Sequence, residues 1–249
     1  MVIIENEILK VSINTKGALL TSINDKRNDE ELLYQIEKDS WPFQDVQIFP
    51  IIGATNYRVK DFKLSSPTRH GFIRNMEFKV INKTNETATL RITSNEETKK
   101  LYPYDFDFFI TYSLKFDKLT ITTKILNLGK GYTQYKLIDG LISEKGTLID
   151  DNKIQLNKDY FKKEDTVVID NTFDKLIIKN GFNHDVIYTF DAPLFALWSR
   201  NDTGNFVCLE PWWGISNVTN EEIELKDTKF INEIKKEKEF TYSLTFQLN

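Results

Sequence analysis

The chain has few residues that could bind a metal or form a disulfide. Its 249 residues include one cysteine, Cys208, and two histidines. A single cysteine excludes an internal disulfide, which is typical of a protein from the reducing cytoplasm. One thiol and two imidazoles do not supply the ligand set of a transition metal, so metal catalysis is disfavoured. Calcium on oxygen ligands stays open, although residues 150–152 lack the spacing of an EF-hand loop.

The sequence also lacks blocks of like charge, long apolar runs and glycine-rich nucleotide-binding motifs. Lys and Arg total 33, Asp and Glu total 37, the net charge is −4, and the charged run at 235–239 mixes both signs. This balance disfavours nucleic acid and anionic membranes as partners. No segment has the length and apolarity of a membrane span, and Glu5 and Glu7 interrupt any N-terminal signal peptide. We therefore expect a cytoplasmic protein without a cofactor.

Regular alternation of apolar and polar residues is the clearest pattern that the chain does contain. From Phe106 to Phe116 every second residue is apolar, a turn follows at 117–118, and the alternation resumes from 119 to 125. Strands with one buried face have this period, so the segment predicts a long hairpin. The same pattern returns between residues 240 and 248.

Shorter strand-like segments fill much of the remaining chain. They lie between clusters of Asn, Asp, Gly or Lys, at spacings typical of antiparallel sheets. These segments are residues 8–13, 77–81, 87–92, 166–169, 175–178, 186–190 and 195–198. Helical periodicity is nearly absent, apart from a turn or two at 29–35. Because no linker rich in Pro, Gly or Ser divides residues 1–249, we predict a single all-β domain, a sandwich of large antiparallel sheets.

A carboxylate beside two tryptophans is the first candidate for chemistry. Glu210 closes an apolar run that begins at Phe206, and a proline, Trp212, Trp213 and a glycine follow it. Indole rings can cover the C–H faces of a pyranose, while a carboxylate can accept the proton of a sugar hydroxyl. A lone Glu is more often an acid that ends a strand in water. Other motifs in the chain favour the sugar site.

A second candidate group lies at residues 70–74, with the sequence His-Gly-Phe-Ile-Arg. His70 stands beside a glycine and between two arginines, and taken alone it fits a structural and a catalytic role equally. Arg74 could donate its planar fork to sugar hydroxyls or pair with a surface acid. The other histidine, His184, precedes a strand-like segment and is predicted to be a turn residue.

Four segments of the chain occur in the order in which they mark a known superfamily. They are Phe-Pro-Ile-Ile-Gly at 49–53, His-Gly-Phe-Ile-Arg at 70–74, Tyr-Pro-Tyr at 102–104 and Cys-Leu-Glu-Pro-Trp-Trp-Gly at 208–214. In combination they resemble the aldose 1-epimerase (galactose mutarotase-like) superfamily, and within it the LacX-like proteins. The resemblance extends from Trp41 to the end of the chain. It implies a β-supersandwich fold.

The resemblance also implies a reaction and roles for individual residues. In the family, a glutamate removes the proton of the anomeric hydroxyl and a histidine gives a proton to the ring oxygen. The ring opens, rotates about the C1–C2 bond and closes to the other anomer. An acid and a base are both needed, because charge on either oxygen alone is costly. Glu210 matches the base, and His70 matches a histidine that holds and polarises the sugar.

Two positions depart from the family pattern. The family's proton-donating histidine lies in a Gly-x-His-Pro-x-Phe segment after the hairpin, and Asp139 stands in the corresponding stretch at 137–142. Asp139 could serve as the acid if burial kept it protonated near neutral pH. If Asp139 is instead a turn residue before Gly140, it could not serve as the acid. The family also carries Arg directly after the Gly of its Phe-Pro segment, where this chain has Ala54. Both differences weigh against catalysis.

The sequence leaves three functions open. The first is a mutarotase for a free or phosphorylated hexose or a related sugar. Its catalytic residues would be Glu210 as base, His70 as helper or substitute acid and Asp139 as donor, with Arg74, Trp212 and Trp213 binding the sugar. The second is a sugar-binding or regulatory relative that has lost the proton-donating histidine. A more remote third is a glycoside hydrolase that uses Glu210 and Asp139 at a fixed separation. We favour the first, with a small-molecule sugar as partner.

Overall fold

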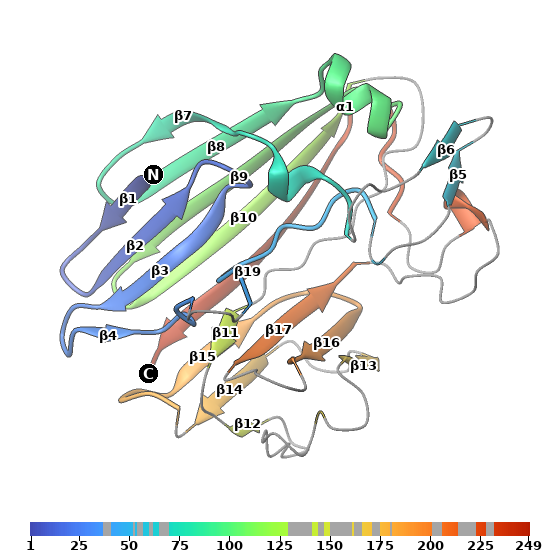
Figure 1. Cartoon of the computed structure of the whole chain (residues 1–249). Helices are drawn as coiled ribbons and strands as arrows, with labels where there is room; N and C mark the ends of the chain where they lie inside the picture. The colour runs from blue at the N-terminus through green and yellow to red at the C-terminus, as the bar shows by residue number, and fades with distance from the viewer. Residues whose placement is uncertain are drawn as a thin grey trace.

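Antiparallel sheets make up most of the structure (Figure 1). The computed structural model describes residues 1–36, 41–51, 53, 57–59, 62–64, 70–128, 141–143, 147–149, 161, 166–170, 175–179, 181–200, 206–213, 223–227 and 232–249. Helical structure among these residues is limited to α1 (Glu96–Leu101) and the 3-10 turns η1 (Ile73–Asn75) and η2 (Leu225–Asp227). The predicted all-β fold class is therefore confirmed.

The largest sheet described has eight strands in the order β12-β14-β15-β19-β10-β9-β8-β7. Its strands are β7 (Lys79–Lys83), β8 (Thr87–Thr93), β9 (Phe106–Lys115), β10 (Lys118–Asn127), β12 (Thr147–Ile149), β14 (Lys175–Lys179), β15 (Val186–Thr189) and β19 (Glu239–Leu248). Strand β7 forms one edge of this sheet, all of its side chains are exposed, and its register to β8 shifts between Val80 and Asn82.

Three smaller sheets complete the described structure. Two of them have four strands, in the orders β1-β2-β3-β4 and β11-β17-β16-β13, and the third has the order β18-β5-β6. Their strands are β1 (Val2–Glu5), β2 (Leu9–Asn14), β3 (Leu19–Asp25), β4 (Glu30–Glu31), β5 (Tyr57–Val59), β6 (Phe62–Leu64), β11 (Leu141–Ser143), β13 (Thr166–Asp170), β16 (Leu194–Trp198), β17 (Val207–Trp212) and β18 (Ile223–Glu224).

The hairpin of β9 and β10 follows the alternation in its sequence. Phe106, Phe108, Ile110 and Tyr112 are fully buried, because every second residue of β9 faces the core. The two strands pair over ten residues each, so the predicted hairpin is confirmed. The prediction that Phe116 continues the buried face is wrong. Phe116 lies in the turn with a φ of 54° and is 72% exposed, because the chain reverses there.

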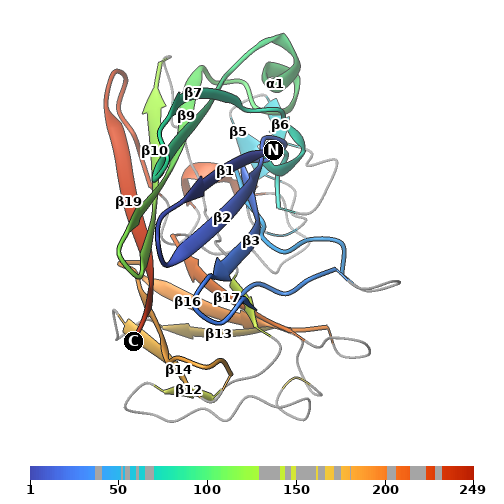
Figure 2. The same cartoon turned by 90° about the vertical axis from the view of Figure 1, so that its left-hand side faces the viewer.

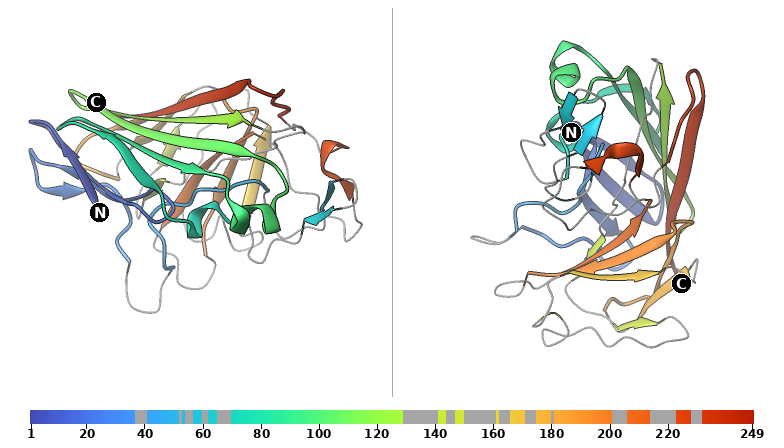
Figure 3. Two further views of the ribbon diagram at one scale, coloured as in Figure 1. Left: turned by 90° about the horizontal axis from the view of Figure 1, so that it is seen from above. Right: turned by 90° about the vertical axis from the view of Figure 1, so that its right-hand side faces the viewer.

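One hydrophobic core joins the layers. Figures 1 and 2 show β1, β2 and β3 facing the large sheet over β8, β9 and β10, with β16 and β17 facing its other half. The main core cluster accordingly includes Ile4 of β1, Phe108 of β9 and Leu209 of β17. The view from above in Figure 3 shows the green and red strands of the large sheet running side by side across the molecule. Burial of apolar surface between these sheets therefore stabilises the large sheet and the two four-stranded sheets together.

Two further expectations differ from the structure. The helical turn expected at 29–35 is wrong, because Glu30 and Glu31 form strand β4 and the Glu31 carboxylate accepts hydrogen bonds from Ile23 N and Leu33 N. Helix α1 was not predicted from the sequence. Its first turn has a capping box, in which Asn95 accepts from Thr98 N while the Thr98 hydroxyl accepts from Asn95 N. In the described part of the chain, no helix is long and apolar enough to cross a membrane.

Candidate functional site

Strand β17 holds Glu210 in a buried position. The strand lies between β11 and β16, and all of its residues are buried. Because successive side chains of a strand alternate, Leu209 enters the main core, whereas Cys208, Glu210 and Trp212 share the opposite face. Glu210 is only 8% exposed. The alternative that Glu210 is an acid ending a strand in water is therefore wrong.

The carboxylate of Glu210 is contacted from its own strand. Trp212 Nε1 donates a hydrogen bond to Glu210 Oε2 at 3.1 Å, and Ala196 of β16 lies opposite Glu210 in the sheet. Burial raises the pKa of the Cys208 thiol well above its usual value, and the charge of Glu210, a hydrogen bond to Glu210 and the charge of Asp45 raise it further. The thiol is therefore protonated at neutral pH.

Residues 41–51, called here the covering segment, lie over this face of β17. Ile48 and Val46 pack with Trp212 and its neighbours on β16, and Trp41 packs edge-on against Trp198 with 4.9 Å between ring centroids. The covering segment is attached to β3 through Asp45, which is buried and whose Oδ2 accepts a hydrogen bond from Leu20 N at 2.8 Å. The covering segment therefore connects β3 to the face of the sheet that carries Trp212 and Trp198.

The segment from His70 to Arg74 packs against the end of the covering segment. Phe49 and Gly71 form a parallel bridge, and Phe72 N donates to Phe49 O at 2.9 Å. Gly71 has a φ of 75°, and a Cβ at this position would lie 1.9 Å from Phe49 O. Only glycine fits here, because both the left-handed backbone and the close approach exclude a side chain.

His70 is fixed by two hydrogen bonds to one residue. His70 N donates to Gly53 O at 3.0 Å, and Gly53 N donates to His70 Nδ1 at 3.3 Å. Since Nδ1 accepts a hydrogen bond, the proton of a neutral His70 ring lies on Nε2. His70 also has a φ of 69°, an uncommon value for a residue with a side chain. The imidazole is thus held with Nε2 as its hydrogen-bond donor.

Arg74 contacts the covering segment at Phe43, whereas Gly71 contacts it at Phe49. Its guanidinium carbon is 5.5 Å from the centroid of the Phe43 ring, a cation–π contact. Burial lowers the pKa of Arg74 from its usual value, which still leaves the side chain charged at neutral pH. Arg74 belongs to the turn η1, which follows directly after the Gly71 contact. The same short segment therefore supplies one imidazole and one guanidinium.

Trp213 points to the opposite side of β17 from Glu210. Its ring lies in the main core, 4.3 Å from the Tyr242 ring between centroids, and its carbonyl oxygen accepts a hydrogen bond from Asn232 Nδ2 at 3.3 Å. Trp212 and Trp213 are both 5% exposed. The predicted contact of these two indoles with a sugar stays a prediction.

The comparison with known families agrees with this arrangement. A family model described as aldose 1-epimerase matches residues 1–137, more than half of the chain. The chain belongs to the aldose 1-epimerase family. A curated relative, the chromosomal protein LacX of Lactococcus lactis subsp. lactis, is 27% identical to it, with 93% of each chain covered. The predicted membership of this superfamily, in its LacX-like branch, is confirmed.

Solved structures of aldose 1-epimerase relatives have the same fold. A galactose mutarotase related enzyme from Lactobacillus acidophilus has a TM-score of 0.90 at 25% identity, covering 100% of this chain and 97% of that one. A galactose mutarotase-like protein from Lactobacillus casei has a TM-score of 0.93 at 20% identity, with 100% of both chains covered. The galactose mutarotase-like architecture expected from the sequence is therefore confirmed.

The covering segment contacts residues next to several of the candidate site residues. Its Val46 and Ile48 pack with Trp212, its Phe43 contacts Arg74, and Phe49 at its end pairs with Gly71, next to His70. Whether these side chains line one pocket stays a prediction. Asp139, Ala54 and Gly214 lie outside the described residues. Among the described residues, no group of three His, Cys, Asp or Glu side chains is arranged to hold a metal ion.

Two buried polar groups in the covering segment were not predicted from the sequence. Asp45 is 2% exposed and Gln47 is fully buried, although both lie in a segment with no strand pattern. The spacing of Cys208, Glu210 and Trp212 by two residues could have indicated that the three share one face of a strand.

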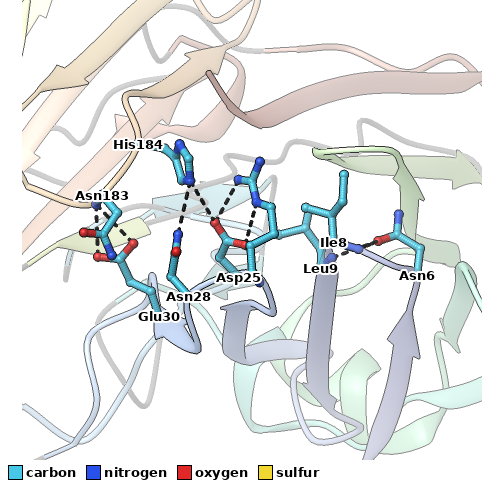
Figure 4. A network of polar contacts seen from close by, with 9 residues as sticks. Asn6, Ile8, Leu9, Asp25, Asn28, Glu30, Asn183 and His184 are labelled. Atoms are coloured by element: carbon cyan, nitrogen blue, oxygen red, sulfur yellow. Dashed lines mark hydrogen bonds and ion pairs between the residues drawn. The ribbon is translucent and has the colours of Figure 1, made fainter.

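The second histidine belongs to a separate contact between two turns (Figure 4). His184 lies before β15, its Nε2 is 3.6 Å from Asp25 Oδ2, and Asn28 Nδ2 is 3.2 Å from the same nitrogen. Asp25 is fully buried and accepts from Arg27 Nε at 2.9 Å and from Arg27 Nη2 at 2.8 Å. The contact joins the end of β3 to the start of β15.

Proposed function

We propose that this protein interconverts the anomers of a hexose or related sugar by opening and closing the sugar ring. The observation that carries the proposal is the position of Glu210. It is a buried carboxylate held by Trp212 Nε1, and Trp212 packs against the covering segment, whose far end pairs with Gly71 beside His70. Membership of the aldose 1-epimerase family supports the same reaction class.

In the proposed reaction Glu210 accepts the proton of the anomeric hydroxyl. The C1–O5 bond breaks as the C1–O1 bond becomes a carbonyl, and O5 gains a proton. Rotation about C1–C2 then presents the other carbonyl face, and the reverse proton transfers close the ring to the other anomer. The reaction needs no net oxidant, reductant or water.

His70 is proposed to donate through Nε2 to a sugar oxygen. Because Gly53 N donates to Nδ1, protonation of Nδ1 would set two N–H groups against each other. The neutral ring is therefore suited to polarise the sugar as a hydrogen-bond donor. Asp139 remains the candidate acid for O5, with Arg74, Trp212 and Trp213 as candidate sugar contacts.

The test is proton NMR of freshly dissolved α-glucose, α-galactose and α-glucose 6-phosphate, with and without protein. We expect one of these sugars to reach anomeric equilibrium faster than in buffer. Glu210→Gln should slow the reaction by about 10²- to 10⁴-fold, because the amide cannot accept the proton, while sugar affinity is largely kept. Glu239→Gln, which alters an exposed glutamate, is the matched control.

A sugar-binding relative without catalysis is the second candidate, favoured by Asp139 and Ala54 at the family's His and Arg positions. Binding of a sugar without faster equilibration would support it. The variant Asp139→His then separates two cases. If the donor is what is missing, the variant should gain activity, because the pKa of imidazolium is near neutral pH. If Asp139 is already a buried acid, the variant should be slower.

A further inference from the structure

Trp212 contacts Glu210 through its polar edge. The indole Nε1 donates to Oε2 at 3.1 Å, and the side chain is 5% exposed. The apolar part of the ring packs with Ile48, Leu194 and Ala196. A tryptophan that stacks on a sugar needs an accessible ring face, whereas this ring is enclosed and its one donor is used within the protein.

Cys208 lies on the other side of Glu210 along the same strand face. Its side chain is 3% exposed and packs with Tyr34 and Phe206. The thiol is protonated because burial and the nearby carboxylates of Glu210 and Asp45 disfavour the thiolate. Cys208 is therefore a neutral neighbour of Glu210, whereas Trp212 donates a hydrogen bond to its carboxylate.

We propose that Trp212 is a positioning residue for Glu210, which orients its carboxylate and keeps it ionised in a buried environment. A buried carboxylate without donors tends to take up a proton, and a protonated Glu210 could not act as a base. A donor at a fixed position on a central strand also restricts the rotamers of the side chain. The catalytic consequence rests on the proposed function, but the contacts themselves do not.

The first test measures the Glu210 carboxylate directly and needs no catalysis. In protein labelled with 13C-glutamate, the carboxyl signal of Glu210 is identified by its loss in Glu210→Gln, and its pH titration is followed. We expect the midpoint to move to higher pH in Trp212→Phe, which keeps an aromatic ring but has no N–H. Cys208→Ala, which alters the other neighbour of Glu210 and keeps the indole N–H, is the control and should move the midpoint less.

A second readout is the 15N indole spectrum, which contains one signal for each of the four tryptophans. Glu210→Gln should move the Trp212 signal, because a charged acceptor is replaced by a neutral one. The Trp41 signal is the internal control, since its Nε1 is buried without a hydrogen-bond acceptor in the described structure. An unchanged Trp212 signal, or an unchanged Glu210 midpoint in Trp212→Phe, would overturn the proposal.

The kinetic consequence distinguishes positioning from sugar contact. Trp212→Phe should lower kcat by about 10- to 100-fold, with little change in KM, and should move the acid limb of the pH profile to higher pH. A raised KM with unchanged kcat and pH profile would instead assign Trp212 to the sugar. If the wild type does not mutarotate, the proposed function fails, and the two NMR measurements still decide this inference.

Discussion

Strands β9 and β10 pair over ten residues each, whereas the covering segment and residues 70–74 are held by a few single contacts. In the hairpin, every second side chain is buried, so many residues of both strands contribute to the packing. Around His70, position depends on one bridge between Phe49 and Gly71 and on two hydrogen bonds to Gly53. Stability and site geometry should therefore respond differently to mutation in the two regions.

The largest effect on stability is expected from Phe108→Ala. Phe108 is fully buried in β9, so loss of its ring should lower the free energy of unfolding by about 3–5 kcal/mol. Its ring is 5.3 Å from that of Phe49 between centroids, so we also expect lower activity per folded molecule. Urea unfolding and anomer exchange measure the two effects.

Phe246→Ala is the matched control for Phe108→Ala. Phe246 is 2% exposed in β19, opposite Leu119 of β10 and Tyr188 of β15. Phe246→Ala should lower the free energy of unfolding by a similar amount while leaving the activity of the folded fraction unchanged. Equal losses of specific activity in both variants would show that Phe108 does not act on the site through its contact with Phe49.

The next effect is expected from Gly71→Ala, which should act mainly on activity. A Cβ would lie 1.9 Å from Phe49 O, and the φ of 75° costs a residue with a side chain about 1–2 kcal/mol. Displacement of His70 by about 1 Å should reduce the rate of anomer exchange by about 100-fold. Asn75→Ala, at an exposed position in the same turn, should keep both stability and rate. A Gly71→Ala protein with normal rate would show that this backbone fit does not position the site.

The smallest effect concerns pH and involves Asp25 at the end of β3. The guanidinium of Arg27 lowers the pKa of Asp25, so the ionised carboxylate stabilises the folded state above the unfolded pKa of about 3.9. This contribution is lost as the pH falls through the lower pKa of the folded state. The difference in unfolding free energy between wild type and Asp25→Asn should therefore shrink as the pH falls from 7 to about 3. Asp227→Asn, at an exposed aspartate, should show no such trend.

The sequence predicts strands best where alternation is long. Strands β9, β10 and β19 were predicted within one or two residues, because ten-residue strands repeat the apolar period several times. Strand β3 was not predicted, since its burial pattern does not alternate. Helix α1 has six residues, too few for a helical period to appear. Local pattern alone therefore does not define these elements.

The candidate site was predicted only in part. Glu210 was predicted from its motif, and its burial on a strand explains why an acid can stand in an apolar run. Asp45 was not predicted, because its burial depends on a hydrogen bond from Leu20, which is distant in sequence. The orientation of Trp212 toward Glu210 follows from strand geometry, but only once residues 207–212 are known to be a strand.

The edge strand β7 bears on how the protein behaves at high concentration. An open sheet edge offers N–H and C=O groups to the strand of another molecule, which is a route to aggregation. The register shift between Val80 and Asn82 bends this edge, and exposed Lys79 and Lys83 place a charge at each end of the strand. A straight strand from a second molecule would meet both a kinked backbone and two positive charges, so β7 protects the large sheet from growing by one more strand.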